Sequence, residues 1–420
     1  MAPRNPAELA PVTLLPAYLP AFSARKLLLS GFAWALLGVL AASSVVGQEL
    51  ARAVDVWTTH GHRKIVLEEF DPSSNRLPGL DAEELWLEIR LPGQVAPRPA
   101  GWELELAGGT WLPGAPGGGE GDWGWWRLAG GTELRFDTVW LRALQRRGRP
   151  YRAKADQDFL WLETPEGPAD RRKGWFLGWF ENGLAFEDVA GEHRHPWTRV
   201  QALQILDEAV APVPGNVWVV LAGGGHFAAT WRLLDRQGRL HLELPWQGSL
   251  TLPLNQVAAL YPRRGTVQSL AERPPRSVQG PASKVLDWSP KQGRSVEGGP
   301  LQVGNRGYPT GFGTRVPSEI RYRVSGPGTF FAQIGVDDEV ASFRNPQPVR
   351  FRLLLDGREL WSSGEVRFGE AARTVRVALD QGGELELRTE AAGRLPFGGH
   401  ANWLCPMWLP GAPSSPRDSG

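Results

Sequence analysis

The chain has 420 residues, an apolar share of 42% and a formal net charge of +1. This length allows two or three domains, and the apolar share is high enough to bury real cores, so the chain is not a disordered protein. The nearly balanced charge creates no overall field that would attract nucleic acid, and we expect no nucleic-acid partner. The single cysteine, Cys405, excludes an intramolecular disulfide.

The first distinctive segment is an uncharged, apolar run at residues 27–46, preceded by Arg25 and Lys26. A helix of this length can span a hydrocarbon core of roughly 30 Å, and the positive residues before it favour a cytoplasmic N-terminus. The small residues before Gln48 equally suit cleavage by signal peptidase. We expect residues 1–48 to be a signal peptide or a membrane anchor, with a buried core helix as the third alternative.

The composition of the rest favours β-structure. Glycine (51 residues) and proline (36 residues) separate short runs of β-branched and aromatic residues, which is typical of many short strands joined by turns. The chain also contains 20 tryptophans. Exposed indole rings are flat apolar surfaces suited to stacking on sugar rings, so their number mildly favours a binding protein.

Residues 50–265 contain a motif that recurs about 58 residues apart, a fixed period that marks repeated units. The three copies are Leu141-Arg142-Ala143-Leu144, Val200-Gln201-Ala202-Leu203 and Val257-Ala258-Ala259-Leu260. Glycine-rich hairpin turns stand at matching places before them. We expect three β-rich repeats, at about 98–146, 156–207 and 215–262, each a small barrel-like unit of four or five strands.

After the repeats, residues 266–284 lose the alternating pattern and gather proline and glycine, the composition of a linker. The following domain is expected at residues 285–411. Residues 412–420 have the composition of a disordered tail.

Three alternating segments with turns between them lie in residues 320–361 of this last domain: IRYRV, FFAQIGVDDEV and VRFRLLLDGRELW. Together with Leu286-Asp287-Trp288 upstream and the closing His400-Ala401-Asn402-Trp403, their order resembles the NPCBM/NEW2 domain. The resemblance covers roughly residues 285–411 and implies a jelly-roll-like β-sandwich that binds carbohydrate. Two positions depart from the family pattern, because Arg315 stands where a histidine is common and Asn402 where an aspartate is usual.

Aromatic and polar residues near the turns of this domain are the candidate glycan site. They are Tyr308, Arg315, Asp337, Trp361, Asn402 and Trp403. An indole ring would stack on the apolar face of a sugar, and the polar groups would hydrogen-bond to its rim. Core packing is the alternative for each tryptophan; Trp403 could pin the last strand to the core.

Asp337, Asp338 and Glu339 form the densest acidic cluster and make calcium the one candidate cofactor, with a structural turn as the alternative. The histidine pairs at 60/62 and 193/195 could face one side of a strand, but the sequence offers them no clear third ligand. No nucleophile elbow, Walker-type loop or H-E-x-x-H motif occurs in the sequence.

We therefore expect a non-catalytic carbohydrate-binding protein of the bacterial cell envelope, located outside the cytoplasm as a periplasmic, membrane-anchored or secreted protein. Its partner is a glycan, and its membrane contact is the N-terminal segment if that segment is retained. One alternative is a glycoside hydrolase-associated enzyme with a site in residues 50–265, since paired carboxylates cannot be recognised from spacing. The other is a structural envelope protein without sugar binding, which the departures at Arg315 and Asn402 keep open.

Overall fold

The computed structural model describes most of the chain between residues 53 and 411. The described residues are 53–67, 77–81, 84–92, 101–147, 156–206, 213–263, 267–283, 287–393 and 399–411. Ala51–Gly420 makes up one compact unit. The apolar run at 27–46 and the tail at 412–420 lie outside the described residues. Within the described ranges, no helix has the length and apolar character needed to cross a bilayer.

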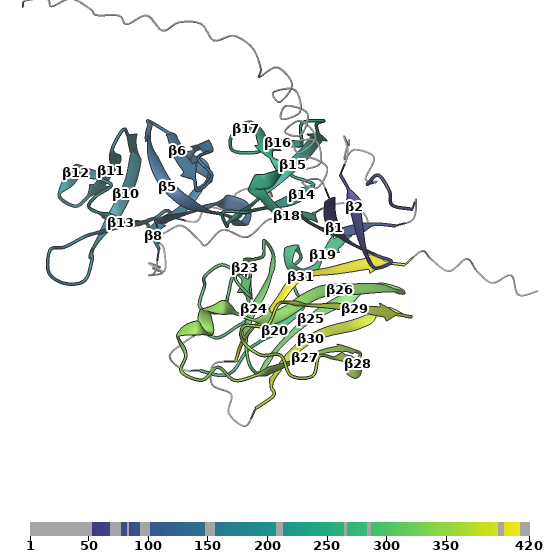
Figure 1. The fold of residues 1–420 in the computed structure, drawn as a ribbon. Helices are drawn as coiled ribbons and strands as arrows, with labels where there is room; N and C mark the ends of the chain where they lie inside the picture. Colours follow the sequence, from purple (N-terminus) through teal and green to yellow (C-terminus); the bar gives the residue numbers. More distant parts are fainter. Residues whose placement is uncertain are drawn as a thin grey trace, which may run out of the picture. The chain divides into compact units, whose positions relative to one another are not determined.

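The regular elements of the described chain are β-strands and short 3-10 turns, which confirms the all-β prediction (Figure 1). The part before residue 264 contains β1 (Ala53–Thr58), β2 (His62–Val66), β3 (Trp86–Arg90), β4 (Trp102–Leu106), β5 (Thr110–Glu120), β6 (Trp123–Leu128), β7 (Glu133–Asp137), β8 (Leu141–Arg146), β9 (Asp158–Leu162), β10 (Asp170–Phe180), β11 (Gly183–Asp188), β12 (Gly191–Pro196), β13 (Val200–Gln204), β14 (Val217–Leu221), β15 (His226–Leu234), β16 (Arg239–Leu244), β17 (Gly248–Pro253) and β18 (Val257–Pro262).

One pattern of strand pairing occurs three times in this middle region. Strands β4 to β7 pair in succession as an antiparallel meander, and β8 returns to pair with β4. Strands β9 to β13 repeat the arrangement, and so do β14 to β18. The motif that recurs in the sequence begins the fifth strand in each case. In two of the three units, a 3-10 turn, η3 (Thr138–Trp140) or η4 (Leu254–Gln256), directly precedes that strand.

The fifth strands also pair outside their own units. β8 pairs with β13, and β18 pairs with β3, which also pairs with β1. Because the strands bury alternate residues, one large apolar core forms that includes Trp126, Phe136, Phe186, Phe227 and Trp231. The middle region is therefore held together by burial and strand pairing, as the lack of a disulfide requires.

The C-terminal region consists of two antiparallel sheets. The first has the order β21 (Lys291–Gln292), β24 (Gly311–Arg315), β31 (His400–Pro410), β26 (Gly328–Val336), β29 (Arg373–Leu379), with β19 (Gln268–Ser269) also pairing with β31. The second has the order β20 (Ser277–Gln279), β25 (Ser318–Val324), β30 (Gly383–Ala391), β27 (Val349–Leu355), β28 (Arg358–Ser362). A small hairpin joins β22 (Gln302–Val303) to β23 (Arg306–Gly307), and η6 (Asp338–Ser342) follows β26.

The two sheets enclose a common core, which confirms the sandwich-like prediction. Phe312, Phe330 and Trp403 from the first sheet belong to one cluster with Phe351 and Leu387 from the second. All five side chains are fully buried. At roughly 25 cal/mol per Å² of buried apolar surface, side chains of this size dominate the stability of the domain.

The segment expected as a linker is structured in part and belongs to this sandwich. β19 adds to the first sheet at Trp408, β20 adds to the second sheet at Ile320, and Leu270 between them lies in the sandwich core. Proline and glycine in this segment predict a linker, but short edge strands tolerate both because one side of an edge strand forms no ladder hydrogen bonds.

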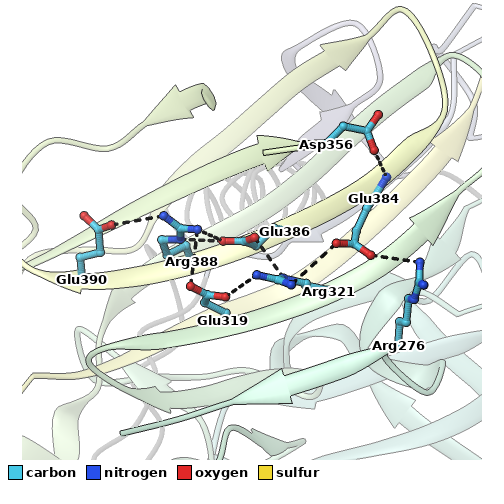
Figure 2. Close-up of polar contacts among 8 residues, drawn as sticks. All are labelled: Arg276, Glu319, Arg321, Asp356, Glu384, Glu386, Arg388 and Glu390. Atoms are coloured by element: carbon cyan, nitrogen blue, oxygen red, sulfur yellow. Dashed lines mark hydrogen bonds and ion pairs between the residues drawn. The ribbon is translucent and has the colours of Figure 1, made fainter. Parts of the chain in front are cut away.

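The outward face of the second sheet carries paired charges. Arg321 on β25 forms ion pairs with Glu319, Glu384 and Glu386, and Arg388 on β30 forms ion pairs with both Glu319 and Glu386 (Figure 2). These residues alternate along each strand with residues of the core, so the face is polar and satisfied by its own pairs. The pairs in which both side chains are partly exposed contribute little stability, about 0–1 kcal/mol each, and the outward side chains of β25 and β30 are charged.

Candidate functional site

A compact group of aromatic and charged side chains gathers around His400, at one end of the first sandwich sheet. We call it the His400 cluster, and its members are Trp288, Glu297, Arg315, Glu339, Phe343 and His400. Strand pairing builds it, because Arg315 ends β24 directly opposite His400, which begins β31. Phe343 follows η6, Trp288 precedes β21 and Glu297 lies between β21 and β22, so five separate segments supply the group.

His400 is the buried centre of the cluster. Its side chain is 1% exposed, and its Nδ1 lies 2.8 Å from Glu339 Oε1 and 3.9 Å from Glu297 Oε1. The ring of Phe343 meets it edge to face with centroids 5.2 Å apart, and the ring of Trp288 lies 5.7 Å away. The imidazole is therefore fixed in orientation by a carboxylate and two aromatic rings.

Trp288 and Arg315 lie where the cluster reaches solvent. Both side chains are half-buried, and the Arg315 guanidinium carbon lies 3.9 Å from the centroid of the Trp288 ring. A guanidinium at this distance is attracted to the negative face of the ring and holds it in place. Glu297 beside them is exposed. The arrangement offers a ligand a preformed aromatic edge, a cation and a carboxylate.

A buried polar layer, formed by Asp337 and Asn402, adjoins the His400 cluster through Glu339. Asp337 at the end of β26 accepts hydrogen bonds from the side-chain amide of Asn402 and from the backbone amide of Glu339, the latter at 2.8 Å. The other amide atom of Asn402, Oδ1, is buried and has no partner among the described residues. Burial and the nearby Glu339 raise the pKa of Asp337 to about 8.

This raised pKa predicts a pH-dependent stability. Between about pH 4 and pH 8 the folded chain keeps a proton on Asp337 that the unfolded chain loses, so stability falls as the pH rises across this window. One retained proton corresponds to a slope of about 1.4 kcal/mol per pH unit. We expect Asp337→Asn, which cannot ionise, to flatten this slope in urea-unfolding curves recorded from pH 5 to pH 8. An unchanged slope in the variant would contradict the assignment.

The structure brings only some of the sequence-predicted site residues together. Arg315 belongs to the His400 cluster, and Asp337 and Asn402 form the layer below it, both at least 99% buried. Trp403 points into the sandwich core between Phe330 and Phe351. A tryptophan in that position presents no surface to a ligand.

Two further predicted residues lie away from the cluster. Tyr308 is 2% exposed, and its hydroxyl donates to Gln333 Oε1 at 3.2 Å. Trp361 is half-buried on β28, the edge strand of the second sheet, opposite Leu353. The three aromatic residues predicted for one site therefore lie apart. Trp403 lies in the sandwich core, Tyr308 makes a buried contact with Gln333, and Trp361 lies on an edge strand.

The acidic cluster has partners within the protein. The carboxylate of Asp338 accepts from the backbone amides of Gly304 and Asn305, at 2.9 and 2.7 Å, while Asp337 binds Asn402 and Glu339 binds His400. Across the described ranges, no three acidic, histidine or cysteine side chains are grouped in a way that could hold a metal ion. The geometry thus favours the structural alternative, a capped turn, over a calcium site.

Trp288, Phe343 and His400 are the functional candidates that sequence reasoning did not select. Trp288 and His400 stood in the motifs that carry the family resemblance, but nothing in the linear order shows that they meet. Their distance in sequence is more than a hundred residues, and the pairings of β21 with β24 and of β24 with β31 bring them close.

The middle region contains a pocket of about 280 Å³ between two glycine-rich turns. Its lining residues are Pro113, Leu128, Ala129, Gly130, Leu221, Ala222, Gly223, Gly224, Asn255 and Gln256. This lining includes no charged or nucleophilic side chain. The two histidine pairs lie elsewhere, and each includes a solvent-exposed ring. This pocket therefore supplies no acid, base or nucleophile for hydrolysis.

Comparison with known proteins places the C-terminal region in a family. Residues 277–407 match the model of the NPCBM/NEW2 domain. A protein of Renibacterium salmoninarum named "Putative endo-alpha-N-acetylgalactosaminidase" is 32% identical over 143 residues, which are 34% of this chain and 9% of that protein. The chain thus spans a small part of the length of this curated relative.

Two solved structures are also similar to the chain. One is CBM51 from Clostridium perfringens GH95 in complex with methyl-galactose, with 21% identity, a TM-score of 0.30, and coverage of 34% of this chain and 99% of that one. The other contains CBM51-2 in complex with GlcNAc and INT domains, also from Clostridium perfringens, with 16% identity, a TM-score of 0.32, and coverage of 54% and 43%.

Proposed function

We propose, starting from the NPCBM/NEW2 domain at residues 277–407, that this chain is a non-catalytic carbohydrate-binding protein that works outside the cytoplasm. In this proposal residues 1–48 direct export or anchor the chain in a membrane. The three five-stranded units of residues 50–265 are barrel-like supports. The sandwich recognises the glycan.

The observation that carries the proposal is the stacking of Arg315 on the half-buried Trp288 beside His400. Sugars combine an apolar ring face with a polar rim, and they bind where an aromatic side chain lies next to fixed hydrogen-bonding groups. The guanidinium of Arg315 can donate to hydroxyl oxygens, and the exposed carboxylate of Glu297 can accept from hydroxyl groups. Arg315 stands where a histidine is common in the family, so this position still carries a hydrogen-bond donor.

Glycan-array binding by residues 51–411 tests the proposal. We expect Trp288→Ala and Arg315→Ala each to weaken binding of the best glycan at least about tenfold, which corresponds to about 1.4 kcal/mol. Trp361→Ala is the matched control, because this half-buried tryptophan lies on the second sheet and should leave the affinity unchanged. Circular dichroism establishes that each variant is folded.

The results separate the alternatives. Loss of binding in Trp361→Ala alone would move the site to the edge of the second sheet. Absence of binding to every glycan by the folded protein would favour a structural envelope role. Hydrolysis of any glycan on the array would favour the enzyme alternative and redirect the search to the middle region.

A further inference from the structure

Two neighbouring strands of the first sandwich sheet, β26 and β31, are buried on both of their faces, which is unusual for an antiparallel sheet with one side in solvent. In β26, Phe330 and Ile334 face the sandwich core, while Phe331 and Gln333 face the other way, yet every one of these side chains is at most 2% exposed. In the second sheet, apolar residues instead alternate along β25 and β30 with the ion-paired charged residues of Figure 2. Something must therefore cover the outer face of the first sheet at β26 and β31.

Residues of the middle region provide the cover. The outward side chains of β26 and β31 share one buried apolar cluster with residues of β3, β14 and β18. Its members include Leu87, Trp218, Val220, Ala258 and Tyr261 from the middle region, and Tyr308, Phe331, Leu404, Met407 and Leu409 from the sandwich.

The three repeats differ at the two positions that make this contact. The first repeat has Arg142 and Gln145, and the second has Gln201 and Gln204, on its fifth strand. The third repeat has Ala258 and Tyr261 at the matching places. The first two repeats show that a fifth strand forms with polar residues at these two positions. Ala258 and Tyr261 are therefore explained by the contact with the sandwich, not by the folding of the repeat.

A buried carboxylate lies at this contact and is bound from both sides. The side chain of Glu88 on β3 is 0% exposed. From the middle region, Tyr261 donates its hydroxyl to Oε1 at 3.0 Å. From the sandwich, Arg306 donates to Oε1 at 2.9 Å and Gln333 to Oε2 at 2.6 Å.

Further polar contacts join the middle region to the sandwich around this buried contact. Arg294 of the sandwich forms an ion pair with Glu105 on β4. The indole nitrogen of Trp218 donates to Glu272 at 2.7 Å, and Glu272 also pairs with Arg263 at 3.0 Å. Only three residues separate Arg263 from the buried Val267.

We infer that β3, β14 and β18 form a dedicated docking face for the sandwich, with Glu88 as its polar anchor, and that the two regions act as one body. Apolar burial supplies the attraction, and it is not directional. A buried carboxylate with donors on both sides is satisfied in one register only, so Glu88 selects how the faces meet. The sandwich is thus not a module that swings on a linker, and its outer face is closed to a glycan.

The inference is tested by cutting the connection in the folded protein. A protease site replaces residues 264–266 in chain 51–411, the purified protein is cleaved, and size-exclusion chromatography at micromolar concentration reports whether the two pieces stay together. We expect them to co-elute. Separation of the pieces without any substitution would overturn the inference.

Two substitutions test what holds the pieces together. We expect Ala258→Arg with Tyr261→Gln to release the sandwich, because these changes give β18 the residues that β8 carries at the same places. The single variant Glu88→Ala should weaken the association of the cut pieces more than about thirtyfold. Arg142→Ala, the reciprocal change on β8, is the control and should have no effect.

Each variant is checked for folding by the far-ultraviolet circular dichroism of the uncut chain. The β18 double variant keeps the test decisive if Glu88→Ala fails to fold, since its new side chains already occur in a folded repeat. Cut pieces of the double variant that co-elute as tightly as the unsubstituted ones would refute the docking face. Unaltered association in a folded Glu88→Ala variant would refute the anchor.

Discussion

Trp403→Ala is expected to lower the free energy of unfolding by about 3–5 kcal/mol, the range for removing a large aromatic side chain from a core. Trp403 is 0% exposed, and its ring lies edge to face with Phe351 at 5.2 Å and near Phe330 at 6.1 Å. Rings from both sheets close around it, so neither sheet can move in to fill the space without losing its own pairing. Urea-unfolding curves of chain 51–411 measure the change.

Trp361→Ala is the control for this experiment. Its side chain is half-buried on the edge strand β28, where neighbouring side chains can rearrange into the vacated space. The expected cost is about 1 kcal/mol, the typical value for a point substitution. Equal losses in the two variants would contradict the central place of Trp403 in the core. A glycan-binding defect in Trp403→Ala should therefore be ascribed to lost packing unless the variant is shown to be folded.

Glu88→Ala is expected to cost a comparable 3–5 kcal/mol, because removing one partner of a buried ion pair leaves the other charge without compensation. Arg306 has a side chain only 16% exposed, and Gln333 and Tyr261 would lose the acceptor that their donors now reach. Arg90, which also binds Glu88, is 30% exposed and can be solvated. Thermal and urea unfolding measure the loss.

The control for Glu88 is a carboxylate that reaches solvent. Glu384→Ala removes ion pairs to Arg276 and Arg321, but Glu384 is 31% exposed and these arginines are more so, so its expected cost is about 0–1 kcal/mol. High salt should weaken the Glu384 contribution and leave that of Glu88 nearly unchanged, since buried pairs are screened less. A loss below about 1 kcal/mol in Glu88→Ala would contradict its role.

These predictions bear on how a glycan could be recognised. The middle region covers one face of the sandwich, and the other face carries paired charges, while the His400 cluster lies at an end of the first sheet. The docking face and the proposed glycan site use different residues, so each can fail without the other. Residues 51–411 are the appropriate fragment for binding studies, because a sandwich cut at residue 285 would lose β19 and β20 and expose its apolar outer face.

The sequence by itself determined the all-β class and the recurring motif, and its resemblance to the NPCBM/NEW2 domain implied the sandwich. Alternation of apolar and charged residues in β25 and β30 reports which side chains enter the core, because a strand turns successive residues to opposite faces. The segment Phe330 to Val336, apolar except for Gln333, likewise contained the sign of a strand covered on both sides. These are local signals, carried by neighbours along the chain.

Only the tertiary structure decided which residues meet. The pairing of β24 with β31 brings Arg315 to His400, and the buried contact between the middle region and the sandwich joins Glu88 to Arg306 across more than two hundred residues. Trp403 could not be told from a binding tryptophan in sequence, because an indole suits a core and a sugar-binding surface equally well. Which role it takes depends on the strands folded around it, and these come from distant parts of the chain.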